Sequence, residues 1–177
     1  MESWALFLLS LLVVLNTIQA GFINEGKNEG KSMVAEDYVI RKSVKIKGSA
    51  SKVWNALTDP SMTKKYFYAS EVHSDWKKGS EIVFKGQLDG KPIELHGEII
   101  EAVPGKVLRY SLKHQTEKKS EKARGYSLVT FAMEEKDGVT TLNVVDDTGS
   151  EEGYQKSVKG WDIILEGLKK LVESQGQ

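Results

Sequence analysis

Residues 145–150 form the first grouping whose side chains could do chemistry, because they contain Asp-Thr-Gly-Ser at Asp147 to Ser150. In aspartic proteases such a motif supplies one of two carboxyl groups that share a proton. That chemistry needs a second aspartate from another lobe or subunit, and a β-barrel lobe to hold the loop. Here the motif stands where a strand must turn toward the last helix, and its residues are ordinary turn residues. We therefore interpret it as a turn.

The histidines could bind a metal or transfer protons only if separate strands bring them together. His73, His96 and His114 form no i, i+4 helical pair, and the chain has no cysteine to help them. His96 lies two residues from both Glu94 and Glu98, so the three side chains share one face of a strand.

This trio could bind a cation or act as acid and base. A solvated outer face of the sheet explains it as well, because Ile93, Leu95 and Ile99 would then point inward. We favour the outer face, and we predict no metal site. No Gly-x-Ser-x-Gly motif, phosphate-binding glycine loop or dinucleotide fingerprint is present, so no catalytic residue and no cofactor are predicted.

Apolar side chains are the better candidates, and they would bind a ligand without reacting with it. Trp161 is the first to test, since it is large and offers a ring N–H. The alternative is that these residues are plain core, and a one-residue slip in the strand alternation would reverse the assignments. The candidates for the lining of a pocket are Trp161, Leu165 and Leu168 near the C-terminus; Phe84, Leu95, Val129, Phe131, Leu142 and Val144 on strands; and Tyr110 and Tyr126 beside a charged loop.

Two short helices and a series of hairpins must position these side chains. Alternating apolar residues predict strands, Asp89-Gly90 and Lys136-Asp137-Gly138 predict hairpin turns, and Asp59-Pro60 predicts a helix start. The expected strands are 38–47, 71–74, 81–87, 93–102, 107–112, 126–134 and 139–147, and the expected helices begin at Ser49, Pro60 and Tyr154.

The last helix, residues 154–172, is amphipathic and needs a partner for its apolar side. The sheet is the only element large enough to cover it. We therefore predict an α+β helix-grip fold, in which a curved antiparallel sheet of six to seven strands, two short helices and one long C-terminal helix enclose a cavity. A twisted sheet curls, and one helix across its concave side should leave this cavity unfilled.

Composition limits the function classes. The 177 residues suit one domain, and 25 basic against 25 acidic residues leave the chain formally neutral. No basic footprint suggests nucleic acid as a partner. Without cysteine there is no disulfide, no thiolate ligand and no lipoprotein anchor.

The first twenty residues differ from the rest. An apolar run from Trp4 to Leu15 is followed by Ala20 and Gly21, which predicts a signal peptide cleaved after Ala20 and a secreted or periplasmic protein. The alternatives are a membrane anchor at residues 4–15, or a cytoplasmic protein that truly starts at Met33. Residues 21–37 are expected to be a linker, and 38–177 the folded domain.

Several segments together resemble a known family, the domain named after the activator of heat-shock-protein-90 ATPase. This domain belongs to the START-like (SRPBCC) superfamily, which also holds the major birch pollen allergen and polyketide cyclases. The matching segments span about residues 38 to 173, in family order: Val53–Pro60, Trp76–Gly79, Gly97–Pro104, Leu108–Ser111, Leu128–Phe131 and Gly160-Trp161.

The resemblance implies a deep pocket between the long helix and the sheet, used in many superfamily members for lipids, hormones or polyketide-like molecules. It implies no shared catalytic residues. Family members often carry a histidine near the end of the last strand, where this chain has Asp146. The eukaryotic co-chaperone also has a second, N-terminal domain, and nothing before Tyr38 could be that domain.

Three function hypotheses follow. The first is the binding or transport of a small hydrophobic molecule in the pocket between sheet and helix. The second is a cyclase or hydrolase, which requires a pocket-lining titratable group with a perturbed pKa. The third is a protein-interaction domain of the chaperone-cofactor kind, which requires an exposed surface for its partner. The ligand's identity and the oligomeric state do not follow from the sequence.

Overall fold

The computed structural model describes residues 38–88, 91–113 and 125–175, all within the compact unit Met33–Gln177. The expected order of elements and the α+β helix-grip class are confirmed. The segment expected to be a signal peptide and linker, as well as His114, lies outside the described residues. The elements are β1 (Val39–Lys47), α2 (Ala50–Thr58), α3 (Pro60–Tyr66), β2 (Glu71–Ser74), β3 (Glu81–Leu88), β4 (Lys91–Val103), β5 (Val107–Lys113), β6 (Tyr126–Lys136), β7 (Val139–Asp147) and α4 (Glu151–Ser174).

Each described helix begins at a side chain that accepts a hydrogen bond from an unpaired backbone N–H. Ser49 caps α2, Asp59 caps α3 just before Pro60, and Ser150 caps α4 by accepting from the N–H of Gly153. In the same stretch, Asp147 Oδ1 accepts from the N–H of Gly149 at 3.3 Å. The Asp-Thr-Gly-Ser motif is therefore a turn, as predicted, and its serine also caps the last helix. The cap also starts α4 at Glu151, three residues before the expected start at Tyr154.

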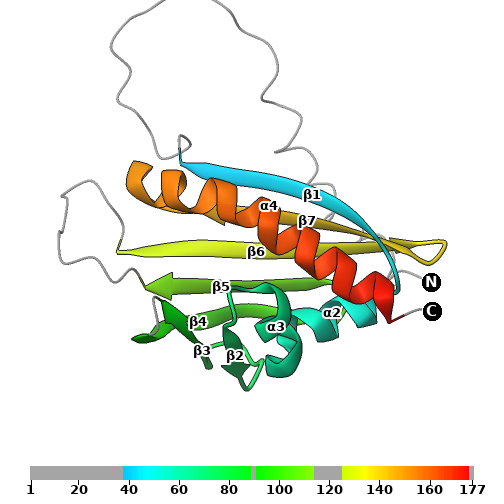
Figure 1. Ribbon diagram of the computed structural model, residues 1–177, viewed down its shortest axis with the longest axis horizontal. Helices are drawn as coiled ribbons and strands as arrows, with labels where there is room; N and C mark the ends of the chain where they lie inside the picture. The colour runs from blue at the N-terminus through cyan, green and yellow to red at the C-terminus, as the bar shows by residue number, and fades with distance from the viewer. Residues whose placement is uncertain (1–37, 89–90, 114–124, 176–177) are drawn as a thin grey trace, which may run out of the picture. The chain divides into compact units, whose positions relative to one another are not determined.

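The strands form one antiparallel sheet in the order β1-β7-β6-β5-β4-β3-β2. Successive strands from β2 to β7 are neighbours, as short hairpin connections require. The first strand, β1, lies at one edge of the sheet and pairs with β7, from Val39↔Asp147 to Lys47↔Val139. Figure 1 shows α4 running diagonally across one face of this sheet, with α2 and α3 on the same face toward the side where β2, β3 and β4 lie.

The core lies between this face and the three helices. On β7, alternation directs Leu142, Val144 and Asp146 toward the helices, and all three side chains are buried. At the edge of the layer, Lys42 of β1 donates to Asp162 of α4 at 2.7 Å, which joins the edge strand to the helix. The last helix is therefore held to the sheet both by the buried core and by this ion pair at the edge.

Two glycines let α4 pass close to the end of α3. A Cβ added at Gly167 would lie 2.8 Å from Cβ of Tyr66, and one at Gly160 would lie 3.0 Å from the hydroxyl of Tyr68. The close approach brings Phe67, which lies between these two tyrosines, against α4. Within the described ranges, no helix is both long and apolar enough to cross a membrane.

Candidate functional site: a buried carboxyl beside an aromatic cycle

Five aromatic side chains meet in a closed cycle inside the domain, each in contact with the next. Phe67 lies 5.1 Å from Phe84 between ring centroids, and Phe84 lies 5.7 Å from Tyr110. Phe131 lies 6.2 Å from Tyr110 and 5.7 Å from Trp161, and Trp161 lies 6.4 Å from Phe67. These separations and tilts are typical of favourable ring contacts. We call this set the aromatic cycle.

The aromatic cycle occupies space between α4 and the sheet, where the fold was expected to leave a cavity. A void of about 10 Å³ remains, enough for one water molecule at most. Among the described residues, the expectation of an open interior cavity is therefore not confirmed. The physical reason is that β3, β5 and β6 each direct one large ring inward, and Phe67 and Trp161 close the space from the helix side. The void is lined by Leu57, Thr63, Tyr66, Phe67, Val72, Ile82, Phe84, Leu108, Tyr110, Phe131 and Ile164.

A carboxyl group adjoins the aromatic cycle at Trp161. The indole Nε1–H of Trp161 donates to Oδ2 of Asp146 at 2.8 Å, and Asp146 is only 4% exposed. Within the described part of the chain, Asp146 Oδ1 is the buried side-chain oxygen that has no hydrogen-bond partner. Buried polar atoms are nearly always paired, so an unpaired carboxylate oxygen calls for an explanation.

Burial dominates the electrostatics of this carboxyl. It raises the pKa of Asp146 from the ordinary 3.8 to about 6, while the hydrogen bond from Trp161 opposes the shift and the charge of Asp147 adds to it. Across the sheet, Asp146 lies opposite Ile40 and Val129, both buried and apolar. Burial also raises the pKa of the Tyr110 hydroxyl well above its usual range, and the charge of Asp146 contributes. The carboxyl is thus a titratable group in an apolar layer.

The structure places most of the predicted ligand-binding residues in the buried core between the sheet and the helices. Phe84, Tyr110 and Phe131 line the void, and Trp161 completes the cycle next to Asp146. Leu95 is half-buried against the core. Tyr126 is 41% exposed, so it does not belong to the buried core with the others. The remaining candidates are buried in the core without lining the void: Leu165, Leu168, Val129, Leu142 and Val144.

Sequence reasoning missed two members of the site. The family resemblance marks Asp146 only as a departure from a histidine, although alternation with Leu142 and Val144 on β7 predicts that it points inward. Phe67 follows the last residue of α3 and has no periodic pattern to place it. It is half-buried, and its neighbours Tyr68 and Ala69 both have left-handed backbone, with φ of 49° and 54°. Such conformations cost non-glycine residues about 1 kcal/mol or more each.

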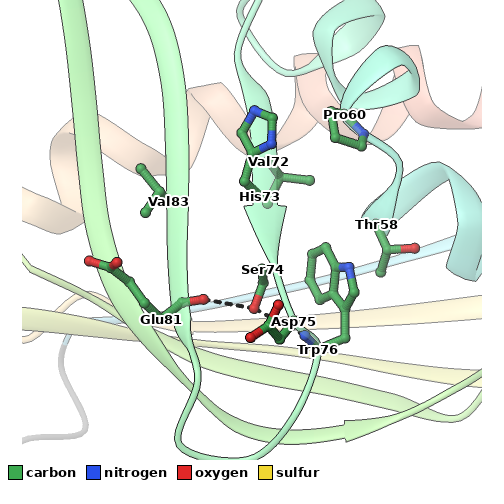
Figure 2. A pocket seen from close by; sticks show the side chains of 9 residues that line it. All are labelled: Thr58, Pro60, Val72, His73, Ser74, Asp75, Trp76, Glu81 and Val83. Atoms are coloured by element: carbon green, nitrogen blue, oxygen red, sulfur yellow. Dashed lines mark hydrogen bonds between the residues drawn. The ribbon is translucent and has the colours of Figure 1, made fainter.

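A separate groove of about 460 Å³ lies at the edge of the sheet, between β2 and the junction of α2 with α3. Figure 2 shows the indole of Trp76 beside Thr58 on one side of the groove, and Glu81 and Val83 on the other. The hydroxyl of Ser74 donates to the backbone carbonyl of Glu81 at 2.7 Å, which holds the β2–β3 connection. The groove is lined by Thr58, Pro60, Val72, His73, Ser74, Asp75, Trp76, Glu81 and Val83.

The two described histidines, His73 and His96, lie on the outer face, as predicted for His96. Its Nδ1 is 2.9 Å from Glu81 and its Nε2 is 3.4 Å from Glu94. His73 Nε2 is 3.6 Å from Glu71. Across the described ranges, no cluster of histidine and acidic side chains has the arrangement to hold a metal ion.

Comparisons with known proteins agree with this fold. The chain is 30% identical to protein ChR145 from Cytophaga hutchinsonii, with a TM-score of 0.62 over 77% of this chain and 94% of that one. It is 20% identical to the Aha1 dimer from Colwellia psychrerythraea, with a TM-score of 0.61 over 76% and 96% of the two chains.

A third solved structure is DynU16, a protein in the dynemicin biosynthetic locus. It is 16% identical, with a TM-score of 0.61 over 78% of this chain and 48% of that one. None of the curated proteins compared with the chain matches it. The family model described as "Activator of Hsp90 ATPase homolog 1-like protein" matches residues 47–173, which is most of the chain. The protein belongs to this family.

Proposed function

We propose that this domain binds a small, mostly apolar molecule between α4 and the sheet, with the aromatic cycle as the apolar wall and Asp146 with Trp161 as the polar end. The observation that carries the proposal is the buried Oδ1 of Asp146, which has no partner although Oδ2 accepts a hydrogen bond from Trp161. An unpaired buried acceptor costs about 1–3 kcal/mol. A ligand that donates to this oxygen would recover that cost on binding.

A ligand that lies against the aromatic cycle must displace a side chain to enter, because the void beside these rings measures about 10 Å³ and admits one water molecule at most. Phe67 is the member of the aromatic cycle best placed to move. It lies on the link between α3 and β2, it is half-buried, and the next two residues have left-handed backbone. The other four rings are fixed on strands or on α4, and each is at most 5% exposed. In the proposal, the ligand's apolar body takes the position of the Phe67 ring.

The indole N–H signals in an NMR spectrum of the full-length protein provide the test. Trp161 reports on the interior and Trp76 reports on the groove, and each signal can be assigned by its loss in W161F or W76F. We expect an interior ligand from a library of small aromatic and aliphatic molecules to shift the Trp161 signal and leave that of Trp76 unchanged. The ligand should also raise the melting temperature in proportion to the logarithm of its concentration.

The proposal fails if no member of the library moves the Trp161 signal. It fails also if the Trp76 signal alone responds, because binding would then occur in the groove.

A second candidate function is the docking of a protein partner at that groove. Its support is the groove's size of about 460 Å³ and its mixed lining beside Trp76, since tryptophan is enriched where proteins bind one another. A purified Hsp90 chaperone is the natural probe, given the family's description. We expect the chaperone to broaden the Trp76 signal, and W76A to weaken its binding about tenfold or more. Equal binding by W76A would exclude this surface.

A further inference from the structure

We infer that the ligand of the interior site is an amine: a compact molecule with an apolar body and a protonated primary or secondary amino group that donates to Oδ1 of Asp146. This inference rests on the proposed function, and it names the ligand's chemical class. It is drawn from the buried carboxyl, the hydrogen bond that carboxyl already accepts, and the aromatic rings around it.

The carboxyl needs a donor that the described part of the protein does not supply. An ionised carboxylate only accepts hydrogen bonds, and Asp146 accepts one from Trp161 through Oδ2 while Oδ1 has none. A neutral donor such as a hydroxyl would satisfy Oδ1 and leave the buried negative charge uncompensated. A protonated amine would satisfy both, and breaking or leaving open such a buried charge pair is costly. The site therefore favours a cation over a neutral molecule of the same shape.

The charged groups around Asp146 do not provide this cation. On β7 the neighbour Asp147 adds negative charge, and the opposite residues on β1 and β6 are Ile40 and Val129. From β5 the neighbouring titratable group is the hydroxyl of Tyr110. On α4, Asp162 follows Trp161 and is paired with Lys42 of β1 at 2.7 Å, so that lysine already has a carboxylate partner.

The aromatic cycle supports the same class of ligand. The faces of tryptophan, tyrosine and phenylalanine rings attract a cation, most strongly where water is excluded. Trp161 donates to the carboxyl through its ring N–H and also contacts Phe131 and Phe67, so the carboxyl adjoins the aromatic cycle at this indole. An apolar body of about one ring would occupy the position that Phe67 now fills.

Calorimetric titration of the full chain with matched probes tests the inference. The probes are 2-phenylethylamine, 2-phenylethanol and phenylacetate, which differ mainly in carrying a positive, neutral or negative end. At pH 7.5 we expect the amine to bind at least about tenfold more tightly than the alcohol, and phenylacetate to bind most weakly. In D146N the amine and the alcohol should bind within about threefold of each other, because the charge is lost and the shape is kept. The matched variant D147N, next on the same strand, should keep the preference.

The pH dependence provides a second readout. A primary amine stays protonated from pH 7.5 to pH 5, whereas Asp146, with a pKa of about 6, becomes protonated as the pH falls. We expect the amine to lose about tenfold in affinity over this range and the alcohol to change little, with no such loss in D146N. Should D146N fail to fold, the wild type alone decides: an affinity for the amine that stays constant from pH 7.5 to pH 5 would contradict the inference.

The outcomes separate the inference from the proposed function. If the alcohol shifts the Trp161 indole signal and binds as tightly as the amine, the site binds ligands and the amine inference is wrong. If D147N loses the preference as fully as D146N does, the carboxyl of Asp146 is not the anchor and the inference is again wrong. If none of the probes binds at millimolar concentration, the amine inference is overturned, while the wider library still tests the proposed function.

Discussion

At the scale of single residues, the buried carboxyl makes stability depend on pH in the direction opposite to most acidic side chains. The pKa of Asp146 is raised by burial to about 6, so between about pH 4 and pH 6 the folded state holds a proton that the unfolded state has released. Its contribution to stability is therefore fully present below about pH 4 and is lost as the pH rises through 6. The loss amounts to at most about 3 kcal/mol.

Chemical denaturation of the wild type and D146N from pH 4 to pH 7.5 measures this contribution. We expect the wild type to lose stability relative to D146N by about 2–3 kcal/mol over that range. The difference between the two proteins is needed because the pKa values of Asp59, Glu71, Glu166 and Glu173 are lowered by their hydrogen-bond partners. The stabilisation from those four groups is present above their unfolded-state pKa and is lost as the pH falls. It therefore depends on pH in the direction opposite to the contribution of Asp146. A constant difference across the range would mean that Asp146 is solvated in solution.

At the scale of elements, the contact between α3 and α4 determines where Phe67 lies. A Cβ added at Gly167 would lie 2.8 Å from Cβ of Tyr66. That atom is next to the backbone and cannot turn away, and the Tyr66 hydroxyl is further held by its donation to the carbonyl of Ala56 at 2.8 Å. Gly160 instead faces the hydroxyl end of Tyr68, which is 55% exposed and free to rotate outward.

The two glycines therefore form a matched pair of test positions within one helix. We expect G167A to be destabilised by about 1–3 kcal/mol, because the added methyl group forces the helices apart. We expect G160A to be neutral or up to about 1 kcal/mol more stable, since alanine has the higher helix propensity and the tyrosine can move. Urea denaturation at pH 7 measures both. Equal effects at the two positions would show that α3 shifts freely on α4.

At the scale of the whole molecule, the sequence was sufficient for most of the fold. Alternation, the Asp59-Pro60 cap and the amphipathic last helix predicted the elements, and the short connections predicted that β2 to β7 are neighbours in order. The pairing of β1 with β7 did not follow from the sequence. Periodicity also placed Phe84, Tyr110, Phe131 and Trp161 in the interior. It could not show that these rings touch one another and fill the hollow, because that depends on the meeting of side chains from strands far apart in the chain. Nor could it place Phe67, which lies outside every regular element.

The closed interior leads to the last prediction, which concerns opening the domain by mutation. Replacing Phe67 by alanine removes one ring from the aromatic cycle and should leave an internal space continuous with the present void. We expect F67A to lose about 2 kcal/mol of stability. It should also bind 2-phenylethanol more tightly than the wild type does, by about tenfold, because the ligand no longer has to displace a side chain.

The control is I163A, which removes a side chain from the outer side of α4, where Ile163 is 60% exposed. This variant should change neither stability nor binding appreciably. If F67A is destabilised but binds the probe no better than the wild type, the interior of the domain is a packed core. The groove beside Trp76 would then be the surface through which the molecule acts, because it is formed without any movement of the aromatic cycle.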